Sequence, residues 1–511
     1  CTTKPKNGMR IRTNTSRLLK YRRMILELML ASHCRDCTAC EKNRSCRLQE
    51  MAVRFGIHHV HFKDTREHVP MDFSSPAVTF DLNKCILCGD CVRVCKEVQG
   101  MSILHFAGRG PGLHIEAGDD QPISTTHCVS CGQCAAVCTT GAITVKNDIG
   151  AAWRALHDPQ KRVVIQIAPA VRVAVGEAFG FPAGENVLDR LVTALKLMGV
   201  DEVYDTTFGA DFTTIAESEE FLERLKNGGP FPMFTSCCPG WVSYVNKTHP
   251  YFVPNLSTTK SPQQIFGALA KSYFAQKKGL KPKEICSVSI MPCVSKKREA
   301  ALFSMRSSGT HDVDIVLTTR ELIRLLRAEH INPAMLDEQP FDNPLGQSTG
   351  AGVIFGASGG VMEAALRTAY HVIEGKEAPE DAFTDVRGTE GRKVREFTLG
   401  GATLRTCTVS GLGNAGKLLD ELKAGKVHYD FVEVMACPGG CVGGGGQPIH
   451  DGEERADVLG NKLYAIDSNR PMRQSHNNPD VQELYKDFLE KPLSEKAEQL
   501  LHSDHVKEHN Y

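Results

Sequence analysis

The sequence predicts an α/β domain preceded by two small units, and three features support this prediction. From about Lys161 onward, apolar strand-like runs such as Ile285–Met291 alternate with amphipathic helical segments, a pattern typical of α/β proteins. Residues 71–150 contain one cysteine spacing twice, and residues 17–70 are helix-rich with a His/Cys group. We therefore expect an α/β domain over 151–511, a small α+β unit over 71–150 and a short helical unit over 17–70.

Bulk composition excludes several function classes. The chain has 511 residues, with 60 Lys and Arg against 60 Asp and Glu. This balance, without a compact basic block, argues against a nucleic-acid partner. The apolar segment 24–31 is too short for a membrane helix, which needs about 18 residues or more. Because no secretory signal is recognisable, we expect a cytoplasmic protein of an anaerobe, or an organellar one if the source is eukaryotic.

Cysteine is abundant, with 20 residues that fall mostly in tight clusters. A large chain without a secretory signal and with clustered cysteines is more typical of metal binding than of a disulfide framework. Thiolates are soft ligands that suit iron–sulfur clusters and zinc. The cysteine pattern therefore predicts metal centres in a reducing compartment.

The short helical unit contains a group with the spacing H-x3-C-x2-C-x5-C, formed by His33, Cys37, Cys40 and Cys46. Spacing alone favours zinc and an iron–sulfur cluster about equally. Its position before a two-cluster unit favours a 4Fe–4S cluster, since a redox-silent ion adds nothing to a relay. We interpret Cys34 as a free thiol. Residues 1–16 resemble the end of a plant-type 2Fe–2S module, but Cys1 lacks its partner cysteines, so we expect no cluster there.

The repeated spacing in 71–150 is C-x2-C-x2-C-x3-C, which is typical of bacterial ferredoxins with two 4Fe–4S clusters. In that arrangement the fourth cysteine of each run binds the other cluster. We therefore assign one cluster to Cys85, Cys88, Cys91 and Cys138, and the other to Cys95, Cys128, Cys131 and Cys134. Zinc is the alternative, but it has no use for this cross-donation. Gly89 and Gly132 occupy turns where positive φ is expected.

Three cysteine loops follow apolar strand-like runs in the α/β region. They span 235–241 with Cys237 and Cys238, 291–299 with Cys293, and 433–446 with Cys437 and Cys441. Open α/β sheets place their sites at the carboxyl ends of strands. Four thiolates from distant parts of the chain, Cys238, Cys293, Cys437 and Cys441, are therefore expected to bind one cluster. The glycine run 443–446 is expected to let backbone approach a bulky inorganic group.

These loops, the cysteine repeat and the His/Cys group together resemble the signature of the iron–iron hydrogenases over nearly the whole chain. The resemblance implies two lobes of mixed or parallel sheets, flanked by helices, around a buried metal site. It also implies an H-cluster, in which a 4Fe–4S cluster is bridged through Cys441 to a di-iron subsite with carbonyl, cyanide and azadithiolate ligands. Three further 4Fe–4S clusters would supply electrons.

The same resemblance implies roles for individual residues. Cys237 would pass protons to the bridge amine, although Cys237 and Cys238 also fit a structural pair. Lys296 would donate to a cyanide, although it also fits a surface lysine. The pocket would be lined by Met291, Met435, Ala168, Pro169, Gln263 and Phe355, with the two methionines alternatively simple core residues. Many relatives have Ser where Ala170 stands, so one hydrogen bond to a cyanide is expected to be missing.

A proton path is expected on one helix over 213–227. Glu217, Glu220 and Arg224 are spaced three and four apart and share a face. The resemblance implies a relay from Cys237 through Glu217, Ser257 and Glu220, with Arg224 at the mouth, whereas the residues alone fit a solvated acidic face equally well. Glu299 is expected to have a secondary polar role near the second loop.

Other signals are weaker. The stretch 411–416 has the glycine spacing of a dinucleotide site, but we expect only tight helix–strand packing there, because the following strand already delivers Cys437. Cys286 and Cys407 lie in apolar runs and are expected to be inert core residues. The charged stretch 478–501 is expected to be helical, to begin near Asn478, to break at Pro492 and to pack on the outside.

The expected function is reversible oxidation of H2 to protons and electrons. Partners would be an electron carrier, either ferredoxin or NAD(P)-linked subunits, and the maturation proteins that supply the di-iron subsite. Three alternatives remain: a hydrogen sensor, which is expected to lack the relay thiol; an iron–sulfur assembly protein, which is expected to lack parts of the loops; and the hydrogen-activating subunit of an NAD(P)-linked complex. Neither nucleic acid nor membrane is an expected partner.

Overall fold

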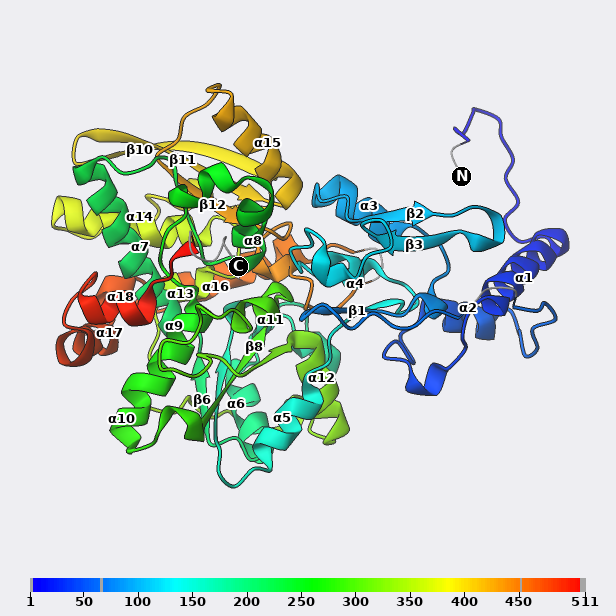
Figure 1. Ribbon diagram of the computed structural model, residues 1–511, viewed down its shortest axis with the longest axis horizontal. Helices are drawn as coiled ribbons and strands as arrows, with labels where there is room; N and C mark the ends of the chain where they lie inside the picture. Colours follow the sequence, from blue (N-terminus) through cyan, green and yellow to red (C-terminus); the bar gives the residue numbers. More distant parts are fainter. Residues whose placement is uncertain (1–2, 65–67, 451–452, 506–511) are drawn as a thin grey trace.

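The computed structural model describes residues 3–64, 68–450 and 453–505. Figure 1 shows a large body of helices and sheets from which the N-terminal part of the chain extends to one side. Within the described residues, no helix is long and apolar enough to cross a membrane. The expectation for Cys1 lies outside the described residues.

The N-terminal part is built from two helices, α1 (Ser16–Ala31) and α2 (Arg47–Arg54). Thr15 caps α1 by accepting a hydrogen bond from the backbone N–H of Leu18. Only Glu27 and Ala31 of α1 are buried, and the chain before this helix has an irregular conformation. This region lies farthest from the large body and contributes little to a core (Figure 1).

The next part contains two short antiparallel pairs and two short helices. The pairs are β1 (Val78–Phe80) with β4 (Ile143–Val145), and β2 (Leu104–Ala107) with β3 (His114–Ala117). The helices are α3 (Asp90–Arg93) and α4 (Gln133–Val137), each of which begins after a glycine at φ +76°. Those glycines, Gly89 and Gly132, have the positive φ that the turns of the repeat were expected to need.

Two four-stranded sheets form the large body (Figure 1). The first has the order β6-β5-β8-β9 and is parallel throughout, while the second has the order β10-β11-β12-β7 and is parallel except for the β10–β11 pair. The strands are β5 (Arg162–Ile167), β6 (Glu202–Asp205), β7 (Met233–Phe234), β8 (Ile285–Met291), β9 (Ile315–Thr318), β10 (Arg392–Leu399), β11 (Ala402–Ser410) and β12 (Phe431–Met435). The expected parallel α/β sheets are present.

Helices between and after the strands complete the α/β body. They are α5 (Ile149–Leu156), α6 (Leu188–Leu197), α7 (Thr207–Asn227), α8 (Pro239–Thr248), α9 (Pro262–Leu269), α10 (Ala275–Lys278), α11 (Ser295–Ala300), α12 (Thr319–Ala328), α13 (Gly350–Ile354), α14 (Gly360–Glu374), α15 (Leu412–Lys423) and α16 (Ala456–Ser468). Helix α7 begins six residues earlier than the expected 213–227, because its first turns are buried and the Asp205 carboxylate accepts from Thr207 N–H at 3.0 Å. Burial thus outweighs the weak helix propensity of Gly209 and the threonines.

The C-terminal stretch consists of α17 (Pro479–Leu484), a π-helical turn and α18 (Glu495–Leu501). Asn478 caps α17 as expected, and Pro492 lies in the break between the π-turn and α18. The stretch is not a simple outer layer, however. Val481, Leu489 and Leu501 are fully buried in a cluster with Phe212 of α7, so one face of these helices belongs to the core.

Candidate active site

Three cysteine-bearing loops leave the carboxyl ends of three strands. Cys237 and Cys238 follow β7 and directly precede α8, Cys293 lies between β8 and α11, and Cys437 and Cys441 follow β12. Pro239 and Gly240 open α8, where proline at the first position is favourable. Strands from both sheets therefore deliver thiols to one place, as expected for sites at the ends of parallel strands.

Four of these thiols lie close together in a largely buried environment. Burial raises the pKa of Cys293, and the thiols of Cys437, Cys238 and Cys441 raise it further. Burial and the thiols of Cys238 and Cys437 raise the pKa of Cys441 to about 12, and burial and the thiol of Cys238 raise that of Cys437 to about 11. Thiols that crowd together in this way need a nearby positive charge before they ionise, and iron supplies such a charge. The donor set therefore fits an iron–sulfur cluster.

A cavity lies directly beside these thiols. Its lining includes every pocket residue expected from the sequence together with Ala170 and three residues that sequence reasoning missed, namely Thr206, Pro262 and Gly356. The remaining lining comes from Ala168, Pro169, Cys237, Cys238, Pro239, Gln263, Met291, Pro292, Cys293, Lys296, Phe355, Met435 and Cys441. Thr206 follows the carboxyl end of β6, so the same strand-end rule that located the cysteine loops points to it as well.

The glycine run after Cys441 packs on protein backbone rather than only on an inorganic group. A Cβ atom on Gly444 would lie 2.3 Å from the carbonyl oxygen of Pro292, and one on Gly445 would lie 2.5 Å from that of Cys131. These glycines thus let the third loop approach both the second loop and the ferredoxin-like region. The sequence predicted only that the glycine run would let backbone approach an inorganic group, and it missed these close contacts between backbone segments.

Lys296 is held at the cavity by a buried polar network. Its ammonium lies 3.0 Å from the Glu299 carboxylate and donates to the Cys237 carbonyl oxygen at 3.1 Å. Gln263 donates to the same carboxylate at 3.0 Å and accepts from Ser289 at 2.7 Å. Burial lowers the pKa of Lys296, but the Glu299 carboxylate outweighs it and leaves that pKa above its ordinary value. A charged, oriented ammonium therefore faces the cavity.

The helix α7 presents the residues of the expected proton path on its buried face. Ser257 donates to the Glu220 carboxylate at 2.7 Å, and Arg224 donates to the same carboxylate at 2.6 Å. The backbone N–H of Thr258 also donates to Glu220, at 3.1 Å, and the Thr258 hydroxyl lies 2.9 Å from Nδ1 of His502. Glu217 and Glu220 are buried, which contradicts the alternative of a solvated acidic face.

Glu217 lies between this network and the cysteine loop. It is completely buried and accepts one hydrogen bond from Ser236 N–H at 3.2 Å, and the Ser257 side chain lies close to it. Burial raises the pKa of Glu217 to about 8, with further contributions from Glu220 and Glu433. The thiol of Cys237 is close enough for Glu217 to raise its pKa, after burial. Glu217 is thus a protonatable residue of α7 that lies close to the Cys237 thiol.

The repeated cysteines of 71–150 group as the ferredoxin pattern requires. Burial raises the pKa of Cys91 to about 12, and the thiols of Cys138, Cys85 and Cys88 contribute to that shift. Burial likewise raises the pKa of Cys134, with contributions from Cys131, Cys128 and Cys95. Each set contains three cysteines from one run and the fourth from the other. The described cysteines of the chain form no disulfide bonds.

The second of these sets borders the active-site loops. Burial and the thiol of Cys437 raise the pKa of Cys131, which shows that the two cysteines are neighbours. The side chain of Gln133 donates to the Gly443 carbonyl oxygen at 3.0 Å, and the Ser295 hydroxyl donates to the Val129 carbonyl oxygen at 2.8 Å. The set formed by Cys95, Cys128, Cys131 and Cys134 is therefore the one adjacent to the catalytic thiols.

The N-terminal His/Cys group is half-buried, except that His33 is buried. Cys37 lies close to Cys46, Cys40 and Cys34, whose thiols add to the effect of burial in raising its pKa. Nδ1 of His33 accepts from the backbone N–H of Arg35 at 3.1 Å, which fixes the imidazole ring. Cys34 therefore lies in the group as well, in addition to the residues of the expected ligand set.

The glycine-rich turn at 411–416 joins the α/β body to the ferredoxin-like region of residues 71–150. A Cβ atom on Gly413 would lie 2.7 Å from the Val98 carbonyl oxygen, and Leu412 N–H donates to the Gln99 side chain at 3.3 Å. The expected helix–strand packing is therefore only part of its role, because the close approach is to the ferredoxin-like region. Cys286 and Cys407 are buried in strands, and burial raises their pKa values to about 12 and about 11, in line with inert core residues.

Together the fold and the site define an iron–sulfur oxidoreductase. The chain matches the family described as "Iron only hydrogenase large subunit, C-terminal domain" over residues 161–445. It also matches "Iron hydrogenase small subunit" over 459–508, "NADH-ubiquinone oxidoreductase-G iron-sulfur binding region" over 22–61 and "4Fe-4S dicluster domain" over 77–139. The chain belongs to the iron-only hydrogenase large-subunit family, and it is an iron-only hydrogenase with N-terminal iron–sulfur domains.

Individual relatives agree with this membership. The chain is 43% identical to "NADP-reducing hydrogenase subunit HndD" of Solidesulfovibrio fructosivorans, covering 99% of this chain and 88% of that one. It is 36% identical to "Iron hydrogenase 1" of Clostridium pasteurianum, covering 99% and 89%. A solved variant of [FeFe]-hydrogenase HydA1 from Chlamydomonas reinhardtii is 40% identical, covers 70% of this chain and 98% of its own, and has a TM-score of 0.63.

Proposed function

We propose that this chain catalyses the reversible interconversion of H2 with two protons and two electrons at a di-iron site. The observation that carries the proposal is the convergence of Cys238, Cys293, Cys437 and Cys441 from three loops beside one buried cavity. Isolated zinc sites would not need a cavity lined with methionine, a charged lysine and a fifth cysteine. The relay residues on α7 lead to the same place.

The four thiols would hold a 4Fe–4S cluster, and Cys441 together with the other lining residues of the cavity would hold the di-iron subsite. When bound, that cofactor supplies the metal chemistry of H2 cleavage and formation. The chain contributes the surroundings. Lys296 offers an ammonium to an anionic ligand, Met291 and Met435 provide polarisable apolar walls, and Ala170 offers no hydroxyl.

Protons would move through Cys237, Glu217, Ser257 and Glu220, with Arg224 at the outer end. The Ser257 hydroxyl donates to Glu220 at 2.7 Å and can exchange its proton by rotation, since a hydroxyl is both donor and acceptor. Glu217, with a pKa near neutral pH, both gives and takes protons under working conditions. The Arg224 guanidinium donates to Glu220 at 2.6 Å and holds this carboxylate at the outer end of the path.

Electrons would pass between the surface and the active site through the N-terminal clusters. The His33 group is the outermost, the set of Cys85, Cys88, Cys91 and Cys138 follows, and the set containing Cys131 is next to Cys437. In this order a partner protein would deliver or accept electrons at the His33 group. It supports an electron relay of three 4Fe–4S clusters.

The electron partner is proposed to be either a ferredoxin or NAD(P)-linked subunits. The second candidate is favoured by the relative named as a subunit of an NADP-reducing hydrogenase, which this chain matches over 99% of its length. In that case the nucleotide and flavin sites belong to other subunits. Maturation proteins would deliver the di-iron subsite.

Infrared spectroscopy of the anaerobically matured protein tests the proposal. We expect stretching bands of carbonyl and cyanide ligands together with H2 production from a reduced dye. Cys237→Ser should keep those bands and abolish turnover, because the relay loses its thiol. Cys286→Ser is the matched control, since Cys286 is equally buried but lies outside the cavity, and it should keep both bands and activity. Absence of the bands in matured protein would overturn the proposal.

The same experiment separates the alternative functions. A hydrogen sensor would show the bands with a turnover far below that of an enzyme, whereas an assembly protein would show iron–sulfur absorption without the bands. The complete relay and all three loops in this chain favour the enzyme.

A further inference from the structure

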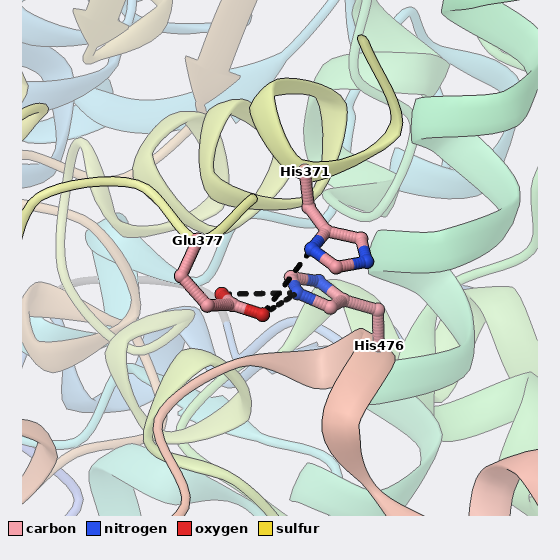
Figure 2. A group of neighbouring side chains, drawn as sticks. All are labelled: His371, Glu377 and His476. Carbon is pink, nitrogen blue, oxygen red and sulfur yellow. Dashed lines mark hydrogen bonds and ion pairs between the residues drawn. The ribbon is translucent and has the colours of Figure 1, made fainter. Parts of the chain in front are cut away.

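A second cluster of possible metal ligands lies at the surface, apart from the buried cavity. It consists of His371 in the last turn of α14, Glu377 in the following loop, and His476 in the 3-10 turn Ser475–Asn477 (Figure 2). Nδ1 of His371 lies 3.2 Å from the Glu377 carboxylate. Nε2 of His476 lies 3.1 Å and 3.2 Å from the two oxygens of that carboxylate. Both imidazole rings therefore face one carboxylate.

We propose that His371, Glu377 and His476 bind one divalent transition-metal ion of the zinc class. Zinc binds histidine nitrogen and carboxylate oxygen at about 2.0–2.2 Å, so the ligand atoms of a tetrahedral site lie about 3.3 Å apart. The distances of 3.1–3.2 Å in this cluster are close to that separation. Two imidazoles and one carboxylate leave a fourth position for water, and this donor set suits zinc, cobalt and nickel.

Surrounding side chains orient the ligands as they do around known metal sites. The Thr368 hydroxyl lies 3.1 Å from Nδ1 of His476, the ring nitrogen that does not face the carboxylate. The amide of Asn477 donates to Glu377 at 3.1 Å. A metal-bound histidine usually donates its other ring N–H to a nearby acceptor, and bound carboxylates are themselves hydrogen-bonded. Outer partners are therefore already in place for His476 and Glu377.

The ring geometry also favours a cation. The two rings stack with centroids 4.1 Å apart and planes 20° apart, an arrangement that opposes two imidazolium charges. Nδ1 of His371 is buried and has no hydrogen-bond partner of good geometry among the described residues. The ion pair with Glu377 leaves this nitrogen without a hydrogen bond, and a metal ion would bind it as a ligand.

Such an ion would fasten the C-terminal segment to the catalytic body. The residues on either side of His476 already contact α7, because Ser475 and Asn478 donate to the Asp211 carboxylate at 2.8 Å and 2.9 Å. The ion would join this segment to the end of α14 and to the loop that follows. The inference is independent of the di-iron chemistry, since none of the three ligands lines the cavity.

Zinc analysis of the matured holoenzyme tests the proposal. We would incubate the protein with ZnCl2, remove weakly bound ion by gel filtration, and locate zinc by anomalous diffraction at its absorption edge. We expect a zinc peak between the three side chains. His371→Ala and His476→Ala should each lose that peak and retain one equivalent of zinc less than the parent.

Two further variants sharpen the result. Thr368→Val keeps the ligands and removes an outer partner, so zinc affinity should fall roughly tenfold or more. His105→Ala is the matched control, because His105 lies 3.0 Å from Glu116 in another His/carboxylate cluster and should leave the peak unchanged. Unchanged iron content and H2 turnover in all variants would show that they are folded. No peak in the parent, or equal zinc retention in parent and histidine variants, would overturn the proposal.

Discussion

The two halves of this protein place their cysteines by opposite means. In 17–150 the thiols come from short local motifs, and several of them, including Cys85, Cys91 and Cys134, pack directly against a small hydrophobic cluster. In the α/β body, Cys238, Cys293 and Cys437 come from three loops more than fifty residues apart, and two large sheets position them. The first region is organised around its clusters, whereas the second is organised around its own core.

This difference predicts a difference in what each region needs in order to fold. A small unit with few buried apolar side chains depends on metal, because cluster binding contributes to its folding free energy. The α/β body has several hydrophobic clusters, the largest built around β5 and β8. Its thiols are brought together by that core, so the site is expected to form before the cofactor arrives.

Iron removal should produce the largest contrast between the regions. After anaerobic chelation, we expect the 17–150 region to unfold and to become protease-sensitive, while a fragment beginning near residue 150 resists digestion. Limited proteolysis followed by mass spectrometry measures this directly. Equal digestion of both regions would contradict a greater dependence of residues 17–150 on metal. Protein reconstituted with iron and sulfide before proteolysis is the control.

The next largest expected effect is a loss of H2 turnover, and it comes from a substitution on the buried face of α7 in the catalytic half. Glu217→Gln keeps the shape of the side chain but cannot release a proton, so H2 turnover should fall by roughly 10²–10⁴-fold, the range that positioned proton transfer contributes. Glu223→Gln on the exposed face of the same helix should change turnover by less than about twofold. Infrared bands must persist in both variants. Equal rates for the two variants would remove Glu217 from the proton path.

The sequence predicted which cysteines lie close together in both halves, for different physical reasons. The ferredoxin-like spacing is local and needs no knowledge of the fold. The three catalytic loops were recognisable because each follows an apolar strand, and strands β8 and β12 have the expected ends at Met291 and Met435. The relay residues required the family resemblance, since a helix with Glu217, Glu219, Glu220 and Glu223 fits a solvated face as well.

What the sequence could not show depends on packing between distant segments. The early start of α7, the place of Thr206 in the cavity and the contact of Gly413 with Val98 all arise from tertiary neighbours. Glu433 is a clear case. This residue of β12 is buried and accepts from the Gly359 and Met362 N–H groups at 2.7 Å, at the start of α14. No local pattern signals that role.

The pH dependence of turnover sharpens the contrast between a buried relay and exposed carboxylates. The pKa of Glu217 is about 8, so this group is protonated below that pH and ionised above it. H2 production at fixed overpotential should therefore decline as pH rises through about 8, because fewer relay groups carry a proton, while H2 oxidation should become faster relative to production. Film electrochemistry from about pH 4 to about 10 measures both directions. A midpoint near the ordinary carboxyl value would contradict a buried relay.

The smallest expected effect is on the rate with a protein electron donor, and it comes from a substitution at the contact between the two halves. Gln133 of the ferredoxin-like region donates to the Gly443 carbonyl oxygen at 3.0 Å, beside the neighbouring cysteines Cys131 and Cys437. Gln133→Leu removes this hydrogen bond, which contributes about 1 kcal/mol, and leaves both cysteine sets intact.

We therefore expect the rate with a protein electron donor to fall a few-fold, because the bond fixes the distance between the two clusters. Exposed Gln121→Leu is the control, since it lies in the same region but away from the contact. Stopped-flow reduction followed by freeze-quench spectroscopy would locate the slowed step between the cluster next to Cys437 and the active site. If turnover with a protein donor were unchanged while the hydrogen bond was lost, the contact would hold the two regions together without setting the electron-transfer rate. The two halves would then differ in how they fold, and the contact between them would have no effect on electron transfer.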